Sequence, residues 1–387
     1  MSDMRKKETV KLSFDRKERA LVLLRALIRS NYFGDHIPDD AALSRLLRIP
    51  RSSLLLAINT LAAQNIIKPG KIQKGWDIIK QATVNKMGTV AFVVNTDALT
   101  GWQSLFQDWL IGFEEIMFQE CYEVQILYGF TSVEDKIQAI SKFRNDGGMG
   151  CVLVSRTEPA VRRYVIDSEI PALILGNATM YEEELGTISI DDCAGIYKAI
   201  EFLIERHHRH ISMYATGLSI HDGYDERYNA YQRAMRQHHL AAHSELAFSE
   251  AHNDLTARRA ADVILRMKHR PTAVLCASDR EAFELVSELN HLDIKVPEEI
   301  SVMGFDNNYF GTLLDPAMTT VDIYAPNMGQ IAANYLLNEM QAAQLPVKIL
   351  TPTEIVVRSS VIELDQNRST HHPDAALTGD SGRILSF

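Results

Sequence analysis

The chain has 387 residues, of which 46% are hydrophobic and 23% charged, and its formal net charge is -10 at neutral pH. At about 150 residues per domain this length predicts two or three domains, and the composition of a globular protein excludes wholesale disorder. The charge is unevenly distributed, because residues 1–86 carry 17 basic and 8 acidic side chains (+9) and the remainder carries 23 basic and 42 acidic ones (−19). A basic head followed by an acidic body is typical of a nucleic-acid-binding module joined to a domain with another task.

Nothing in the sequence supports a secreted, membrane-spanning, metal-dependent or catalytic protein. The first residues lack the apolar run of a signal peptide, and no later stretch approaches the ~18 apolar residues of a membrane span. The scattered cysteines favour buried free thiols in a reducing compartment, so we expect a cytoplasmic protein. The histidine-rich segments 207–210 and 238–239 have no acidic or thiol partner at ligand spacing, so we expect no metal and no cofactor. Motifs of phosphate-binding loops, serine hydrolases and zinc proteases are missing from the sequence, so we do not expect an enzyme.

Residues 17–79 have the pattern of a small helical module that ends in a β-hairpin. Hydrophobic spacing and turn residues predict three helices, at residues 17–28, from residue 38 onward and from residue 51 onward. Two short strands are predicted after them, at residues 66–67 and 76–79. Ser52 or Ser53 is the predicted cap of the third helix. This order predicts a winged helix-turn-helix, in which the third helix lies in the major groove with its first residues facing the base edges.

The candidate DNA contacts lie around the predicted third helix and the hairpin. Arg51 at the start of that helix can pair with guanine through two hydrogen bonds, and Ser52 and Ser53 suit phosphate oxygens. A solvated basic surface is the alternative interpretation of the arginines and lysines, and we favour DNA contact for Arg51 because of its position. The full candidate set is Asp39, Arg45, Arg48, Arg51, Ser52, Ser53, Lys68, Lys71, Lys74 and Gly75.

The head resembles a known family of DNA-binding domains. Residues 34–43 (GDHIPDDAAL) and 49–61 (IPRSSLLLAINTL) are similar to the GntR-type signature, in which G-x-x-L-P-S-E-x-x-L-A precedes V-S-R-x-T-V-x-x-A-L-x-x-L. The sequence departs from it at Asp39, Pro50 and Asn65, which stand where the family has serine, serine and glycine. The resemblance implies a GntR-type winged helix-turn-helix that binds double-stranded DNA, without fixing the operator sequence.

After residue 86, short apolar runs alternate with helical stretches. The runs are rich in β-branched residues, as in strands buried on both faces, and the alternation requires parallel strands joined by crossover helices. We therefore expect a doubly wound α/β fold. Strands are predicted at residues 88–94, 122–128, 150–155, 171–176, 186–191, 210–215, 272–278 and 300–306. Helices are predicted at residues 102–119, 133–144, 159–167, 194–205, 225–239, 256–268 and 280–289. The pattern starts again after residue 191, which predicts two successive lobes with a cleft between them.

Short polar side chains follow most of these strands. Ligands of open parallel sheets bind beyond the carboxyl ends of the strands, and a set of carboxylates, amides and hydroxyls suits a hydroxyl-rich ligand such as a sugar. Trp102 and Phe106 can supply ring faces to such a ligand, or else pack within the core. The candidate effector contacts placed in this way are Asn95, Asp97, Trp102, Phe106, Arg156, Asn177, Asp191, Ser278 and Asp306. Asp279 and Asp306 can also be helix caps, and we favour a cap or a structural role between the lobes for Asp279 and a ligand contact for Asp306.

The body resembles the LacI/GalR effector domain over residues 88–362. The family has a V-x-G-F-D stretch followed by a P-x-L-T-T-V stretch, and residues 300–306 and 315–321 are similar to these two. Residues 273–279, 227–231 and 208–211 match further characteristic segments of the family. It implies a type I periplasmic-binding-protein fold in which Arg227, Ser278 and Asp306 contact the small-molecule effector. At Gly176 some relatives carry an aspartate that this chain lacks, so Asn177 is a weaker candidate.

These observations predict a cytoplasmic transcriptional regulator, most simply a repressor and homodimer, with an architecture similar to that of bacterial arabinose repressors. Its partners would be operator DNA and a sugar-like effector, with no membrane. The alternative is a sugar-binding sensor whose N-terminal domain contacts protein rather than DNA. The expected domains are a winged helix-turn-helix at 1–80, a linker at 81–87, the effector-binding and dimerisation domain at 88–362 and a disordered tail at 363–387.

Overall fold

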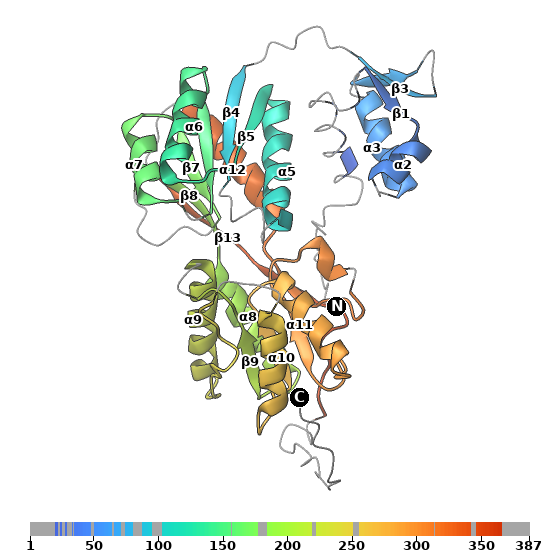
Figure 1. The fold of residues 1–387 in the computed structure, drawn as a ribbon, viewed down its shortest axis with the longest axis vertical. Helices are drawn as coiled ribbons and strands as arrows, with labels where there is room; N and C mark the ends of the chain where they lie inside the picture. Colours follow the sequence, from blue (N-terminus) through green and yellow to red (C-terminus); the bar gives the residue numbers. More distant parts are fainter. Residues whose placement is uncertain are drawn as a thin grey trace, which may run out of the picture. The chain divides into compact units, whose positions relative to one another are not determined.

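The computed structural model describes residues 20–21, 24, 28, 33, 35–47, 50–63, 66–70, 74–79, 87–94, 103–155, 157–176, 184–218, 222–250, 255–312, 314–341 and 346–365. The chain divides into two compact units, residues 1–190 with 324–351 and residues 191–323 with 352–387 (Figure 1). Within the first unit we describe the head, residues 20–79, separately from the first lobe, which begins at residue 87. The second unit is called the second lobe. Several expectations lie outside the described residues, namely those for Arg48, Lys71, Asn95, Asp97, Trp102, Arg156, Asn177, most of the linker and the end of the tail.

The head contains two complete helices and a small antiparallel sheet. The helices are α2 (Asp40–Leu47) and α3 (Arg51–Ala63), and the strands β1 (His36–Pro38), β2 (Ile67–Pro69) and β3 (Gly75–Ile78) pair in the order β1-β3-β2. The hairpin was predicted, whereas β1 was not. The predicted apolar face of α3 is confirmed, because all four of its residues are fully buried, namely Leu54, Ala57, Ile58 and Leu61.

The residue before the first turn of α3 differs from the predicted serine cap. The helix begins at Arg51, and the carbonyl of Pro50 accepts hydrogen bonds from the N–H groups of Ser53 and Leu54. A proline before the first turn leaves no N–H of its own unsatisfied, so the helix starts there and Ser52 and Ser53 lie inside it rather than at its cap. At α2 the expected acidic cap is confirmed, because Oδ1 of Asp39 accepts the N–H of Ala42 at 2.8 Å.

The first lobe is built on a six-stranded parallel sheet in the order β13-β8-β7-β6-β4-β5. Its strands are β4 (Gly88–Val93), β5 (Tyr122–Leu127), β6 (Gly150–Val154), β7 (Ala172–Leu175), β8 (Gly186–Ile190) and β13 (Lys348–Thr351), and its helices are α5 (Gln103–Gln119), α6 (Val133–Asn145), α7 (Pro159–Asp167) and α12 (Ala325–Gln341). Alternate residues of the strands face opposite sides. Ala91 and Val93 pack with α6 and α7, whereas Phe92 packs against Phe113 of α5 at 5.2 Å between ring centroids.

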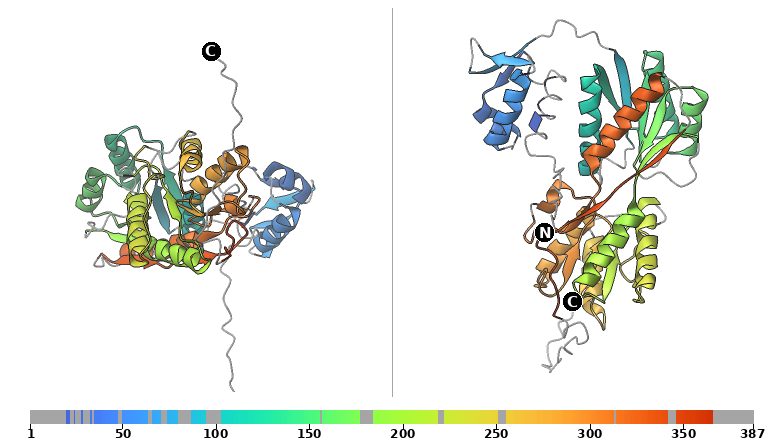
Figure 2. Two further views of the ribbon diagram at one scale, coloured as in Figure 1. Left: turned by 90° about the horizontal axis from the view of Figure 1, so that it is seen from below. Right: turned by 180° about the vertical axis from the view of Figure 1, so that it is seen from behind.

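Helices α5 and α12 lie side by side on that second face (Figure 2). Their backbones meet at Gly112 and Gly329. A Cβ atom on Gly112 would lie 1.8 Å from the carbonyl oxygen of Pro326, and one on Gly329 would lie 2.0 Å from that of Trp109. Glycine is therefore the residue that permits this close packing of the two helices.

The second lobe carries a parallel sheet in the order β11-β10-β9 and a separate antiparallel pair, β12 with β14. The strands are β9 (Ile211–Tyr214), β10 (Ala273–Cys276), β11 (Ser301–Met303), β12 (Thr320–Asp322) and β14 (Glu354–Val356). The helices are α8 (Asp192–Glu205), α9 (Asp222–Gln237), α10 (Thr256–Arg266), α11 (Asp279–His291) and the short 3₁₀ helix η1 (Tyr309–Thr312). Buried side chains of β10 and β11 pack against α10 and α11 to form its core.

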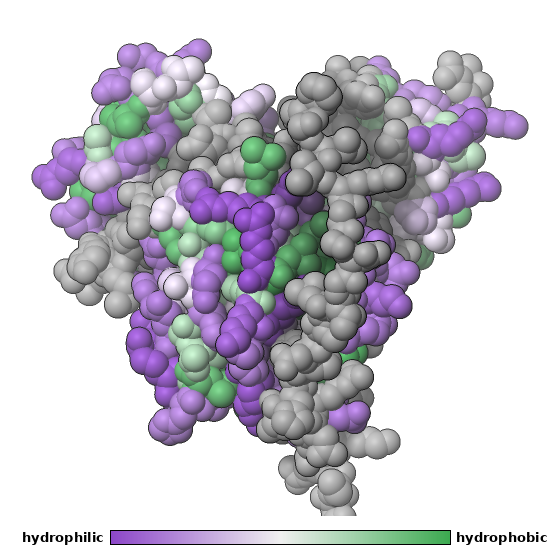
Figure 3. All heavy atoms as spheres, turned by 60° about the horizontal axis from the view of Figure 1, so that its bottom comes forward, coloured by the Kyte–Doolittle hydropathy of each residue, from purple (hydrophilic) through white to green (hydrophobic). Residues whose placement is uncertain are grey.

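The predicted strands and helices of the body are confirmed to within a few residues, and the first break between units, at residue 190, falls where the pattern was seen to restart. The lobes are not simply successive, because α12 and β13 return to the first lobe before the chain ends in the second. Hydrophilic side chains cover most of the described surface in Figure 3, with apolar areas between them. Within the described part of the chain, no helix has the length and apolar character needed to cross a membrane.

Candidate functional site

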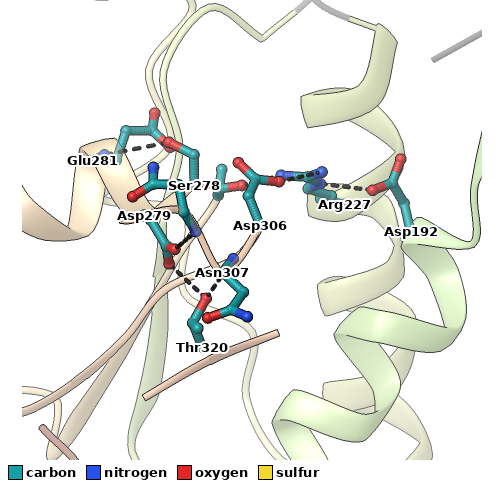
Figure 4. A network of polar contacts seen from close by, with 10 residues as sticks. Asp192, Arg227, Ser278, Asp279, Glu281, Asp306, Asn307 and Thr320 are labelled. Atoms are coloured by element: carbon teal, nitrogen blue, oxygen red, sulfur yellow. Dashed lines mark hydrogen bonds and ion pairs between the residues drawn. The ribbon is translucent and has the colours of Figure 1, made fainter. Parts of the chain in front are cut away.

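The most densely charged part of the second lobe lies at the carboxyl ends of its parallel strands. Arg227 projects from α9 and is fully buried. Its Nε donates to Oδ1 of Asp192 at 2.7 Å, and its Nη1 donates to the carbonyl oxygen of Ala277 at 2.5 Å. Its Nη2 lies 3.0 Å from Oδ1 of Asp306 (Figure 4), and the guanidinium carbon lies 3.8 Å from the ring centroid of Phe305. One arginine thus joins carboxylates from two distant segments of the lobe.

The contact between Arg227 and Asp306 is close, but its geometry is not that of a hydrogen bond. The two atoms are at ion-pair distance, yet among the described residues neither Nη2 of Arg227 nor Oδ1 of Asp306 has a hydrogen-bond partner with suitable geometry. Both atoms are buried, where an unused donor or acceptor costs free energy. The two atoms therefore attract each other as an ion pair, and the arginine is held in place by Asp192 and by the carbonyl oxygen of Ala277.

The pKa values of this group follow from burial and from mutual attraction. Burial raises the pKa of Asp306 to about 6, although the neighbouring charge of Arg227 opposes the rise. Burial likewise raises the pKa of Asp192, and Arg227 again opposes it. Burial alone would lower the pKa of Arg227, but the charges of Asp192 and Asp306 keep it above its usual value, so the guanidinium stays protonated.

Ser278, rather than Asp279, caps α11. Ser278 is the N-cap of α11 and accepts the N–H of Glu281 at 3.2 Å, so the cap expected of Asp279 is wrong. Asp279 is the first helical residue, and its two oxygens accept the hydroxyl of Thr320 at 2.5 Å and the N–H of Asn308 at 2.7 Å. Asp279 therefore fastens the loop after β11, which carries Asp306, to the start of α11 (Figure 4).

Two residues that the sequence analysis did not select contact members of this polar group, namely Asp192 and Glu281. Asp192 follows β8 directly after Asp191, but Asp191 caps α8 by accepting the N–H of Ala194 at 2.9 Å, and Asp192 is the residue that binds Arg227. Glu281 is buried and accepts both the N–H and the hydroxyl of Thr216. From sequence alone, an acidic residue in the first turn of a helix is expected to interact with the helix dipole. Only the fold shows which of these residues also binds a distant side chain.

The structure also places the remaining expected effector contacts and the metal candidates. Phe106 is buried and packs on Phe92 at 5.5 Å between centroids, which favours the core alternative for it. His208 hydrogen-bonds Thr272 and the carbonyl oxygen of Ile362, and burial lowers its pKa to about 4. Among the described residues, no three His, Cys, Asp or Glu side chains are grouped to hold a metal ion.

In the head, the predicted DNA-contacting side chains divide into exposed and buried ones. Arg45, Ser52, Lys68 and Lys74 are exposed. Ser53 does not fit a phosphate contact, because its side chain is buried and its N–H is bonded to Pro50 within the helix start.

Gly75 has a structural role in the hairpin. Its φ is +133°, and a Cβ atom there would lie 2.2 Å from the carbonyl oxygen of Ile37. Because L side chains rarely adopt this backbone conformation and β1 passes so close, the turn into β3 requires glycine.

Arg51 is exposed and is oriented by an acidic neighbour. Its Nε and Nη2 donate to the two carboxylate oxygens of Asp40 at 2.7 and 3.3 Å, an arrangement that lowers the pKa of Asp40. Among the described residues Nη1 of Arg51 has no hydrogen-bond partner. The pair therefore fixes one edge of the guanidinium and leaves the other end available to a base.

The comparisons with known proteins bear on the body of the chain. Residues 200–361 match the family model described as a periplasmic binding protein-like domain. The body has a periplasmic-binding-protein-like fold. The HTH-type transcriptional repressor PurR of Vibrio atlanticus is 34% identical over 172 residues, covering 44% of this chain and 51% of that protein. The chain spans about half to two thirds of the length of the curated relatives it matches.

Solved structures support the same fold. A LacI family regulator from Enterococcus faecium with bound ribose has a TM-score of 0.62 at 18% identity, covering 72% of this chain and all of that one. The lac repressor dimer bound to operator and an anti-inducer has a TM-score of 0.61 at 18% identity, covering 71% and 94%. These periplasmic-binding-protein-like relatives are named as regulators.

Proposed function

We propose that this protein is a transcriptional repressor whose affinity for operator DNA is controlled by a small, sugar-like effector. The observation that carries the proposal is the match of residues 200–361 to the periplasmic-binding-protein-like family together with the identity to repressors such as PurR. The protein would act in the cytoplasm as a homodimer, each subunit reading one half-site. The effector would act through its different affinity for the DNA-bound and released arrangements.

The effector site would be centred on Arg227 and Asp306. Support comes from the paired charges of the two side chains, to which a ligand hydroxyl could bond by accepting from the guanidinium and donating to the carboxylate. Asp192 would orient Arg227 without touching the ligand. Asp191 and Ser278, both helix caps, would contribute at the same edge of the second lobe.

The head would be a winged helix-turn-helix of the GntR type occupying residues 1–80, joined by a linker to the effector domain at 88–362. Its support is the order of α2, α3 and the β2–β3 hairpin, with the residue pattern noted above. Helix α3 would enter the major groove with Arg51 at its leading end, and Lys68, Lys71 and Lys74 of the hairpin would approach the phosphates.

The effector hypothesis is tested by thermal unfolding of the full chain with neutral pentoses, hexoses and their acids. A ligand that binds the folded form stabilises it by about 2.7 kcal/mol at one hundred times its Kd, so a hit raises the melting temperature. Asp306→Asn is expected to abolish this rise, because the neutral amide accepts a weaker hydrogen bond than the carboxylate and forms no ion pair with Arg227. Glu299→Gln, an exposed change elsewhere in the lobe, is the matched control. An undiminished response in Asp306→Asn would remove Asp306 from the site.

Arg51→Ala is expected to weaken binding to a specific operator by roughly 1–3 kcal/mol, because it removes a guanidinium that pairs with a base. Asp40→Asn should weaken it in the same direction and less, because it only loosens the orientation of Arg51. Electrophoretic mobility shifts at several salt concentrations measure both effects. Arg45→Ala is the comparison, since loss of a phosphate contact weakens all sequences alike and lowers the salt slope. Equal operator affinity in Arg51→Ala and the wild type would contradict the assignment.

A further inference from the structure

The solvent-facing side of α3 is apolar in its centre. Leu55 and Leu56 are 38% and 48% exposed. The helix buries a different set of side chains in the core of the head, and Arg51 is its single charged residue. The core of the head is thus filled without these two leucines, so their exposure calls for a partner outside the head.

The two leucines lie on one stripe with polar residues suited to bases. Ser52, Leu55, Leu56 and Asn59 are spaced at i, i+3, i+4 and i+7, which places them on one face within about 100° of the helix circumference. All four are exposed. The amide of Asn59 has the donor and acceptor that match adenine in the major groove. Arg51 borders this stripe at its N-terminal end.

The segment of the sequence that contains the stripe has a basic net charge. Arg45 of α2, Lys68 of β2 and Lys74 before β3 are exposed in the same small domain, and residues 1–86 carry a formal charge of +9. A second basic head would be repelled by this surface, whereas a polyanion is attracted. The occupant of the stripe therefore combines negative charge with apolar groups of methyl size.

Duplex DNA supplies that combination in one place. The C5-methyl group of thymine is the apolar group on the base edges of the major groove, and leucine side chains can pack against it. We propose that Leu55 and Leu56 bind thymine methyl groups in the operator, so that the half-site read by α3 contains A·T pairs beside the base read by Arg51. This inference rests on the proposed function, since it takes α3 to lie in the major groove.

The test uses the full chain and an operator that the protein itself selects from a random duplex library. Each thymine of the selected half-site is then replaced by uracil, which removes the methyl group and keeps the hydrogen-bonding pattern. At one or two positions we expect affinity to fall about fourfold, the factor for withdrawing one methyl-sized group from an apolar contact. Leu55→Ala and Leu56→Ala should each abolish the difference between thymine and uracil at one position.

The controls separate the possible failures. Leu255→Ala changes a leucine of the second lobe that is 70% exposed and should leave the preference for thymine intact. Equal binding of thymine and uracil duplexes by the wild type, or an unchanged preference in both α3 variants, would overturn the inference while leaving the repressor function standing. A changed oligomeric state with an unchanged preference would identify the leucines as a protein contact and also overturn it. Failure to select any duplex would reject the repressor function and the inference together.

Discussion

Arg227→Ala is expected to destabilise the second lobe by about 3–5 kcal/mol, the cost of removing one partner from a buried ion pair. The reason is that Asp192 and Asp306 both lie against this guanidinium and are almost completely buried. Without it, two carboxylates remain in a water-poor environment. The loss is measured by urea unfolding followed by a probe in the second lobe.

Two controls give this prediction its specificity. The triple variant Asp192→Asn, Arg227→Met, Asp306→Asn should be more stable than Arg227→Ala, because it removes the uncompensated charges along with the arginine. The deficit of Arg227→Ala should also shrink at pH 5, where the carboxylates take up protons. A deficit below about 1 kcal/mol at pH 7.5 would mean that the ion pairs are not buried as described. A lost effector response in Arg227→Ala alone therefore cannot assign a ligand contact, and Asp306→Asn is the better variant.

The stability of the second lobe is expected to fall as the pH rises toward 8, and Asp279→Asn should remove much of this dependence. Burial, with the charge of Asp306, raises the pKa of Asp279 from its usual 3.8 to about 8, against the hydrogen bond from Thr320. The folded state then holds a proton that the unfolded state releases. The stabilisation is complete below pH ~4 and is lost as the pH approaches 8, by up to about 1.4 kcal/mol for each pH unit.

Urea unfolding at pH 5.5, 7 and 8.5 measures this loss. The neighbours of Asp279 include Asp306, Thr320, Asn308 and Arg358, and Asp306, with a pKa of about 6, adds to the trend in its lower part. Asp279→Asn keeps the side-chain volume and cannot ionise, so its unfolding free energy should change little above pH 7. A wild-type stability that is constant between pH 5.5 and 8.5 would show that Asp279 is ionised in the folded protein. Asp293→Asn, at an exposed position after α11, is the matched control.

Local pattern was sufficient for most elements of the body. Runs such as residues 88–93 and 150–154 are strands because β-branched and aliphatic side chains pack well on both faces of a parallel sheet. Helix α7 was predicted with its observed bounds, since Pro159 can begin a helix but cannot continue one. Pro50 likewise marks the start of α3, so the helix begins at Arg51 and the predicted cap at Ser52 or Ser53 was wrong.

The residue pattern did not predict which distant segments of the chain contact each other. Strand β13 adds to the edge of the first sheet by pairing with β8, and a short strand carries no signal that names its neighbour. Similarly, nothing local distinguishes Asp191, a helix cap, from Asp192, a buried partner of Arg227.

The sequence by itself determined that the chain consists of a basic head with helices and a hairpin and of an acidic α/β body. It could do so because net charge and residue periodicity depend only on composition and residue order. Through its resemblance to the LacI/GalR effector domain, the sequence also singled out Arg227 and Asp306 as expected effector contacts. The tertiary structure decided which charges meet. Arg227 is buried between Asp192 and Asp306, and Asp279 between Thr320 and Asn308, because folding packs segments that are distant in the sequence against the carboxyl ends of β10 and β11. Burial strengthens the attraction between those charges and raises the carboxyl pKa values, and burial exists only once the chain has folded.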